Sequence, residues 1–149
     1  SCDGSPSIRS RLMGRKTPKP VVAIDPLYQR GDCDCGLASL AMALGVPYQA
    51  VCAAAKALKI KALKEGVYMV ELTRIAKKLG VTLVRTPVDA HLERTGVLAV
   101  ARKGKRDSDH VVCCFRGVIF DPASGLAWCP SAFFVGKRPT YFLSRKDEA

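Results

Sequence analysis

Cys35 lies at a position where a thiol could act as a nucleophile. Gly36 follows it, an apolar run begins there, and Gln29 lies six positions earlier. The positive end of a helix dipole favours the thiolate of a cysteine at the helix start. Gly36 adds no bulk beside the sulfur, and the Gln29 amide and backbone N–H groups could stabilise an oxyanion. A buried structural cysteine at a helix start would show the same local pattern.

A general base must come from one of only two histidines, His91 and His110. If Arg116-Gly117 forms a two-residue hairpin turn, Asp121 lies opposite Val112. His110 shares a strand face with Val112, so His110 and Asp121 become diagonal neighbours at about 7–8 Å between Cα atoms. A carboxylate in that place can fix the imidazole tautomer. A slip of one residue would move Asp121 to the other face, leaving His110 as a polar strand-end residue.

The first half of the chain, residues 33–80, has the apolar spacing of helices. The helix from Cys35 should end at Gly45, and Asp32 or Asp34 could cap its start. Pro47 suits the first turn of a second helix. A third helix is expected over Tyr68–Leu79, stopped by Gly80.

The second half of the chain has short β-prone runs between turn residues. Helices followed by strands predict an α+β domain with an antiparallel sheet. We expect one domain over residues 21–149, preceded by a basic N-terminal arm at residues 1–20. The expected strands are Val81–Val84, Val97–Ala101, His110–Phe115, Val118–Asp121, Ala132–Val135 and Tyr141–Leu143.

The order of these motifs resembles the bacteriocin-processing (double-glycine leader) cysteine peptidases, which belong to the papain-like superfamily. The matching elements are Gln29, then Cys35-Gly36, His110-Val111-Val112 and the Asp121–Gly125 segment, which reads Asp-Pro-Ala-Ser-Gly. The segment from Glu71 to Val81 is similar to the family's third helix and its exit into a strand. The resemblance covers about residues 25–127. In the transporter-linked members the domain begins a long membrane protein, whereas about thirty residues precede Cys35 in this sequence.

The resemblance implies a role for each of the four site residues. Cys35 is the nucleophile, His110 the general base and then general acid, and Asp121 orients the imidazole. Gln29 and the Cys35 backbone N–H form the oxyanion hole. The implied reaction is hydrolysis of a peptide or protein amide bond through a Cys35 thioester, with no metal or organic cofactor. The implied fold is papain-like, with the Cys on the helical half and the His and Asp on the sheet.

Rival residues are weaker candidates for these roles. Cys33 precedes the expected helix, so it is a spectator or a partner in a regulatory disulfide. Cys113 and Cys114 should pack as small hydrophobes on the two faces of a strand. A zinc site built from them with Cys33 and Cys35 lacks the usual ligand spacing. His91 is expected at the surface, and Trp128 in the core or the wall of a groove.

Composition restricts the class of protein and its compartment. No apolar run is long enough to span a membrane, and the N-terminus lacks the apolar centre of a signal peptide. Seven cysteines without a disulfide framework then favour reduced thiols and a cytoplasmic location. The net charge of +11 suits a solvated surface, nucleic acid or an acidic protein partner. The alternatives to a peptidase are therefore an inactive peptidase-fold binding module or a structural or virion component.

Overall fold

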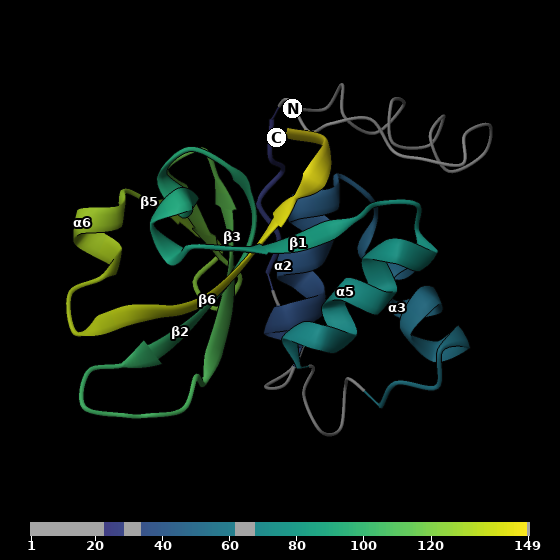
Figure 1. Cartoon of the computed structure of the whole chain (residues 1–149), viewed down its shortest axis with the longest axis horizontal. Coiled ribbons are helices and arrows are strands. Elements are labelled where there is room, and N and C mark those ends of the chain that lie inside the picture. Colours follow the sequence, from purple (N-terminus) through teal and green to yellow (C-terminus); the bar gives the residue numbers. More distant parts are fainter. Residues whose placement is uncertain (1–22, 29–33, 62–67, 149) are drawn as a thin grey trace.

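The computed structural model of the chain describes residues 23–28, 34–61 and 68–148. Within them, three helices precede a six-stranded antiparallel sheet, so the α+β prediction is confirmed. The helices form one half of the molecule and the sheet the other, with the first helix against the sheet (Figure 1). Gln29, Cys33 and the arm at residues 1–20 lie outside the described residues.

The three N-terminal helices follow the predicted periodicity closely. Helix α2 spans Cys35–Leu44 and ends at Gly45, whose positive φ of 68° is the left-handed C-cap conformation. Helix α3 spans Tyr48–Ala57, with Pro47 at its N-cap rather than in its first turn. Helix α5 spans Met69–Lys78. Every residue of α2 after Cys35 is buried, which makes it the central helix of the fold.

The sheet has the strand order β1-β6-β2-β3-β4-β5, so the last strand lies between the first and the second. All five pairings are antiparallel. A short 3-10 helix, η1 (Val88–Leu92), joins β1 to β2, and η2 (Lys146–Glu148) follows β6. The strands are β1 (Leu83–Thr86), β2 (Thr95–Arg102), β3 (His110–Phe115), β4 (Val118–Asp121), β5 (Leu126–Trp128) and β6 (Lys137–Arg145).

The β3–β4 hairpin has the predicted register. Phe115 pairs with Val118, and Cys113 pairs with Phe120. The two turn residues, Arg116 and Gly117, have φ angles of 47° and 93°, as a two-residue type I′ turn requires. This register places the end of β4 beside the start of β3.

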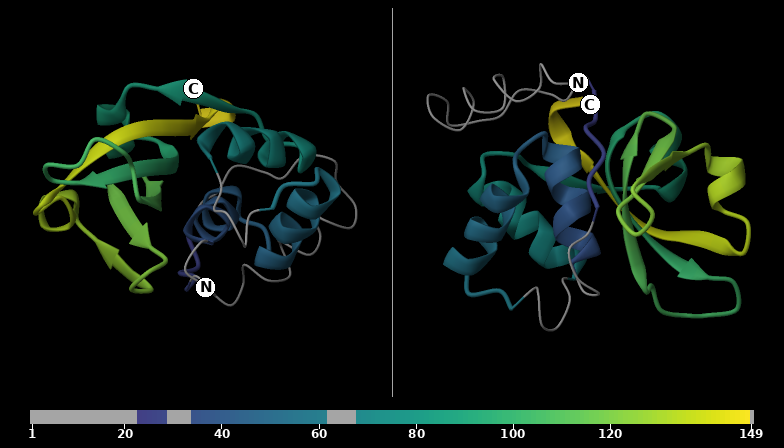
Figure 2. Two further views of the ribbon diagram at one scale, coloured as in Figure 1. Left: turned by 90° about the horizontal axis from the view of Figure 1, so that it is seen from below. Right: turned by 180° about the vertical axis from the view of Figure 1, so that it is seen from behind.

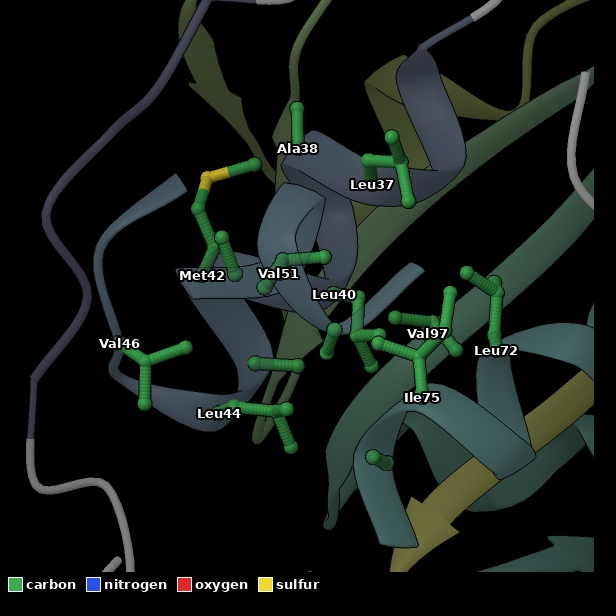
Figure 3. Packing of buried hydrophobic residues seen from close by; sticks show 14 of the residues in the cluster. Leu37, Ala38, Leu40, Met42, Leu44, Val46, Val51, Leu72, Ile75 and Val97 are labelled. Atoms are coloured by element: carbon green, nitrogen blue, oxygen red, sulfur yellow. The ribbon is translucent and has the colours of Figure 1, made fainter. Parts of the chain in front are cut away.

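Two apolar clusters lie on opposite faces of the sheet. The larger packs α2, α3 and α5 against β2 and β3; Figure 3 shows Leu40 of α2 beside Ile75 of α5 and Val97 of β2. The smaller lies on the other face and includes Val112, Cys114 and Phe133. The views in Figure 2 show the three N-terminal helices together on one side of the sheet. Helix α2 packs against the sheet on one side and against α3 and α5 on the other, so its position and that of its N-terminal residue are fixed.

The strands differ from the prediction in several places. Strands β2 and β6 extend beyond the predicted Val97–Ala101 and Tyr141–Leu143. Residues Ala132–Val135 do not form a strand, because Pro130 starts the short helix α6 (Pro130–Phe133) and lacks the N–H a strand ladder uses. Strand β1 is shifted to Leu83–Thr86 by its pairing with β6. Strand β5 was not predicted, since two of its three residues are exposed.

Among the described residues, no single helix is long and apolar enough to cross a bilayer. Helices α2 and α3 together reach that length and composition, but they are bent by 116° at the break between them.

Candidate active site

The N-terminus of α2 presents Cys35 at the end of the sheet. Asp34 occupies the N-cap position and Cys35 is the first helical residue. The thiol is half-buried, and its residue packs against the larger apolar cluster. Ser39, one turn further on, donates a hydrogen bond from Oγ to the Val111 carbonyl oxygen of β3 at 2.9 Å. This bond ties the helix that carries Cys35 to the strand that carries His110.

His110 and Asp121 meet at the same end of the sheet. His110 is the first residue of β3 and Asp121 the last of β4. The His110 Nε2 atom lies 2.6 Å from Asp121 Oδ1, and both side chains are largely buried. The diagonal pairing expected from the hairpin is therefore present. Because Nε2 faces the carboxylate, Nδ1 is the ring nitrogen left for exchange with a thiol.

The Cys35 thiol interacts with the His110 ring. Burial by itself lowers the pKa of His110, but hydrogen bonds to Asp121 and Cys35 and their charges raise it to about 9. At neutral pH the ring is therefore protonated. Thus the helix start, β3 and β4 bring together Cys35, His110 and Asp121, three of the four predicted site residues. Gln29, the fourth, lies outside the described residues.

The turn after β4 holds the Asp121 carboxylate in place. Its Oδ1 also accepts a hydrogen bond from the Ala123 N–H at 3.0 Å. Burial alone raises the pKa of Asp121, but hydrogen bonds from His110 and Ala123 and the charges of His110 and Lys137 lower it. The carboxylate is thus kept ionised beside the protonated ring.

The segment that leads to Gln29 passes beside this turn. The Tyr28 ring lies so close to Gly125 that a Cβ built on Gly125 would come within 2.4 Å of it. Gly125 also has a φ of 71°, where a side chain is strained. The residue just before Gln29 therefore contacts the turn that holds the Asp121 carboxylate.

The sequence did not predict the buried hydrogen bond made by the acid next to Cys35. Asp34 was expected as a possible cap, but within the described residues its carboxylate makes no capping hydrogen bond. Its Oδ2 accepts a hydrogen bond from the Tyr48 hydroxyl at 2.7 Å, and Asp34 is fully buried. Burial, then the bond to Asp34, raises the pKa of Tyr48. The only signal in the sequence was a tyrosine at the start of an alanine-rich helix.

The second histidine is buried, so the prediction that His91 lies at the surface was wrong. His91 is only 6% exposed, because its ring packs against the Phe134 ring with 5.3 Å between the ring centroids. Its Nδ1 has no hydrogen-bond partner among the described residues, and burial lowers its pKa. Burial therefore keeps the His91 ring neutral at neutral pH.

The remaining cysteines of the strands pack as predicted. Cys113 and Cys114 are both fully buried, and they belong to the two clusters on opposite faces of the sheet. Burial raises the pKa of both thiols, so they stay protonated. Opposite faces cannot supply ligands to one zinc ion, which argues against the four-cysteine site. Trp128 is half-buried, packs against the smaller cluster and donates from Nε1 to Ser124 Oγ at 3.3 Å.

Comparisons with known proteins add no identification. No family model matches this chain, and no curated protein is significantly similar to it.

Proposed function

We propose that this protein is a papain-like cysteine peptidase that hydrolyses an amide bond of a peptide or protein. The observation that carries the proposal is the His110–Asp121 pair at 2.6 Å beside a cysteine at a helix start. An imidazole fixed by a carboxylate and aimed at a helix-terminal thiol is the arrangement that nucleophilic acyl transfer requires. The resemblance of residues 25–127 to the double-glycine leader peptidases supports the same function. So does the order of helices followed by strands.

In this reaction each of the four predicted site residues has a role. The Cys35 sulfur attacks the carbonyl carbon, and His110 holds the thiol proton on Nδ1. The protonated ring gives that proton to the leaving amine as the C–N bond breaks, which leaves a thioester. The ring then takes a proton from water, whose oxygen displaces the sulfur to give a carboxylic acid. Asp121 holds the ring in one tautomer throughout, and the resemblance implies that Gln29 stabilises the oxyanion.

Labelling with a thiol-reactive acyl probe tests the proposal. The protein should be labelled at Cys35, found by mass spectrometry of the peptides, and Cys35→Ala should abolish that signal. His110→Ala should slow it by about 100-fold, since general-base catalysis is worth about that much or more. Loss of labelling in Cys33→Ala but not in Cys35→Ala would overturn the assignment of the nucleophile.

Cys129 supplies the necessary control. This thiol is exposed, and a hydrogen bond from Ser131 lowers its pKa, so it is a reactive thiol without a histidine partner. The test should be run in a Cys129→Ser background. In the parent protein, labelling of Cys129 should be insensitive to His110→Ala, whereas labelling of Cys35 should depend on it.

A second candidate function is a non-enzymatic binding module, favoured by the net charge of +11. In that case the acyl probe would label Cys35 no faster than Cys129. The protein would still retard nucleic acid or an acidic protein in a salt-dependent manner.

A further inference from the structure

Basic side chains gather at one end of the sheet, on two segments that are far apart in the sequence. One segment is the end of β2 with the loop that follows it, and the other is the start of β6. All of these side chains are exposed, and only Asp107 and Asp109 bring negative charge to the same segments. We name this set the basic loop surface; it consists of Arg102, Lys103, Lys105, Arg106, Lys137 and Arg138.

Strand pairing and hydrogen bonds hold the two segments of the basic loop surface together. Arg102 pairs with Lys137 across the β2–β6 ladder, and Arg138 Nη2 donates to the carbonyl oxygens of Lys105 and Arg106 at 2.9 and 3.2 Å. The Lys103 N–H donates to the Gly136 carbonyl oxygen at 2.8 Å. Like charges directly opposite on neighbouring strands destabilise a sheet. An anionic partner would relieve this repulsion.

Most of the positive charge on this surface is not neutralised by the protein. Arg102 forms an ion pair with Asp109 at 2.8 Å. Across residues 23–28, 34–61 and 68–148, no carboxylate forms an ion pair with Lys103, Lys105 or Arg106. The Lys137 ammonium instead lies 4.9 Å from the Phe133 ring centroid.

The basic loop surface adjoins the candidate active site. The loop at residues 103–109 runs directly into His110, and the Asp109 N–H closes it on the Val100 carbonyl oxygen at 3.1 Å. After the hydrogen bonds from His110 and Ala123 and the charge of His110, the charge of Lys137 also lowers the pKa of Asp121. In Figure 1 this loop lies at the lower end of the sheet, the end at which β3 and α2 begin.

We propose that the basic loop surface binds an acidic segment of the polypeptide that enters the active site, which makes it a specificity-determining surface. This inference rests on the proposed peptidase function. Nucleic acid is the less suitable partner, because single-stranded binding uses exposed aromatic rings for stacking. The aromatic ring that contacts Lys137, that of Phe133, is 1% exposed.

Binding of an acidic peptide to the full chain tests the proposal. A fluorescein-labelled hexaglutamate peptide should bind the Cys35→Ala protein with a Kd that rises steeply with sodium chloride, and a hexaglutamine peptide should not bind. Charge reversal at Lys103, Lys105 and Arg106 to glutamate should weaken binding by about tenfold or more, since three exposed charge contacts reverse sign.

A matched control separates this surface from the overall charge. Arg74, Lys77 and Lys78 are exposed on α5, in the other half of the molecule. Changing these three to glutamate lowers the net charge from +11 to +5, as the test variant does. The control should bind the acidic peptide within about twofold of the parent. Circular dichroism and thermal unfolding check that both variants fold.

The proximity of surface and site gives a second readout. In the protein with an intact Cys35, saturating hexaglutamate peptide should slow acyl-probe labelling of Cys35, and charge reversal should remove that protection. Equal loss of binding in the two triple variants, or binding without protection of Cys35, would overturn the proposal. Tighter binding of a single-stranded oligonucleotide than of the peptide, lost in the same variant, would also overturn it. Failure of the acyl probe to label Cys35 would instead contradict the peptidase, while the binding measurement would still decide whether the surface takes acidic peptides.

Discussion

At the scale of single residues, the central feature is a carboxylate oxygen that serves two donors. Asp121 Oδ1 accepts from His110 Nε2 and from the Ala123 N–H. These two hydrogen bonds therefore fix which ring nitrogen of His110 faces the acid. The pKa of His110 is raised from 6.5 to about 9, so its interactions favour the folded state fully below about pH 6.5. That contribution is lost as the pH rises through about 9.

Replacing the acid by an amide should lower this pKa. In Asp121→Asn the charge is lost but an oxygen acceptor remains, so the midpoint of the His110 titration should fall well below 9. NMR of the ring Cε1–H signals measures it directly, because the chain has only two histidines and burial lowers the pKa of His91. The control is Asp109→Asn, which removes an exposed negative charge from the residue next to His110. An unchanged midpoint in Asp121→Asn would contradict the assigned pair.

The buried Asp34–Tyr48 hydrogen bond should contribute to stability. Tyr48→Phe removes the donor and leaves a buried carboxylate with one partner fewer, at a cost of about 2 kcal/mol of unfolding free energy. Urea denaturation measures the loss. Tyr141→Phe serves as the control, since its hydroxyl makes no hydrogen bond with the described residues and should change stability by less than about 0.5 kcal/mol. A larger loss in the control than in Tyr48→Phe would exclude a special role for the Asp34 bond.

At the scale of elements, the sequence predicted the helices and turns that are determined by residues close together in the chain. The helix from Cys35 to Gly45 and the β3–β4 hairpin follow from periodicity and turn residues, and they place two site residues correctly relative to each other. Elements defined by partners were missed or shifted. Strand β5 exists through pairing with β4, and β1 takes its bounds from β6. The burial of His91 likewise depends on Phe134, more than forty positions away.

The turn that follows β4 should depend on a glycine. Gly125→Ala introduces a side chain at a φ of 71° and against the Tyr28 ring. The backbone strain alone costs about 1 kcal/mol, and the contact with the ring adds to it. Thermal unfolding measures the sum. The double variant with Tyr28→Ala should recover the contact part and leave the backbone part, whereas strict additivity of the two changes would show that the ring and the turn do not touch.

At the scale of the whole molecule, one arginine joins the two halves. Arg145, the last residue of β6, is fully buried and donates from Nη1 to the Ala43 and Leu44 carbonyl oxygens at 3.2 and 3.4 Å. Its guanidinium also pairs with Asp147 at 2.8 Å. A cation at the C-terminal end of α2 complements the helix dipole. The helix that carries Cys35 is thus held at its far end by the sheet that carries His110.

Removing this cation should destabilise the molecule as a whole. Arg145→Met keeps most of the volume but leaves the two carbonyl oxygens without a charged donor, at a cost of about 2 kcal/mol. Chemical denaturation followed by both tryptophan fluorescence and circular dichroism measures it. Arg102→Met, which breaks an exposed ion pair, should cost less than about 0.5 kcal/mol. Equal losses in the two variants would show that Arg145 has no special place in the fold.

The central position of β6 has a consequence for the order of synthesis. Strands β1 and β2 leave the ribosome well before residues 137–145, yet β6 must lie between them. Until that segment emerges, the sheet cannot close and α2 lacks the Arg145 contact at its C-terminal end. A nascent chain would therefore carry Cys35 and His110 without a rigid frame to align them. Alignment of Cys35 with His110 would thus come only after β6 has joined the sheet.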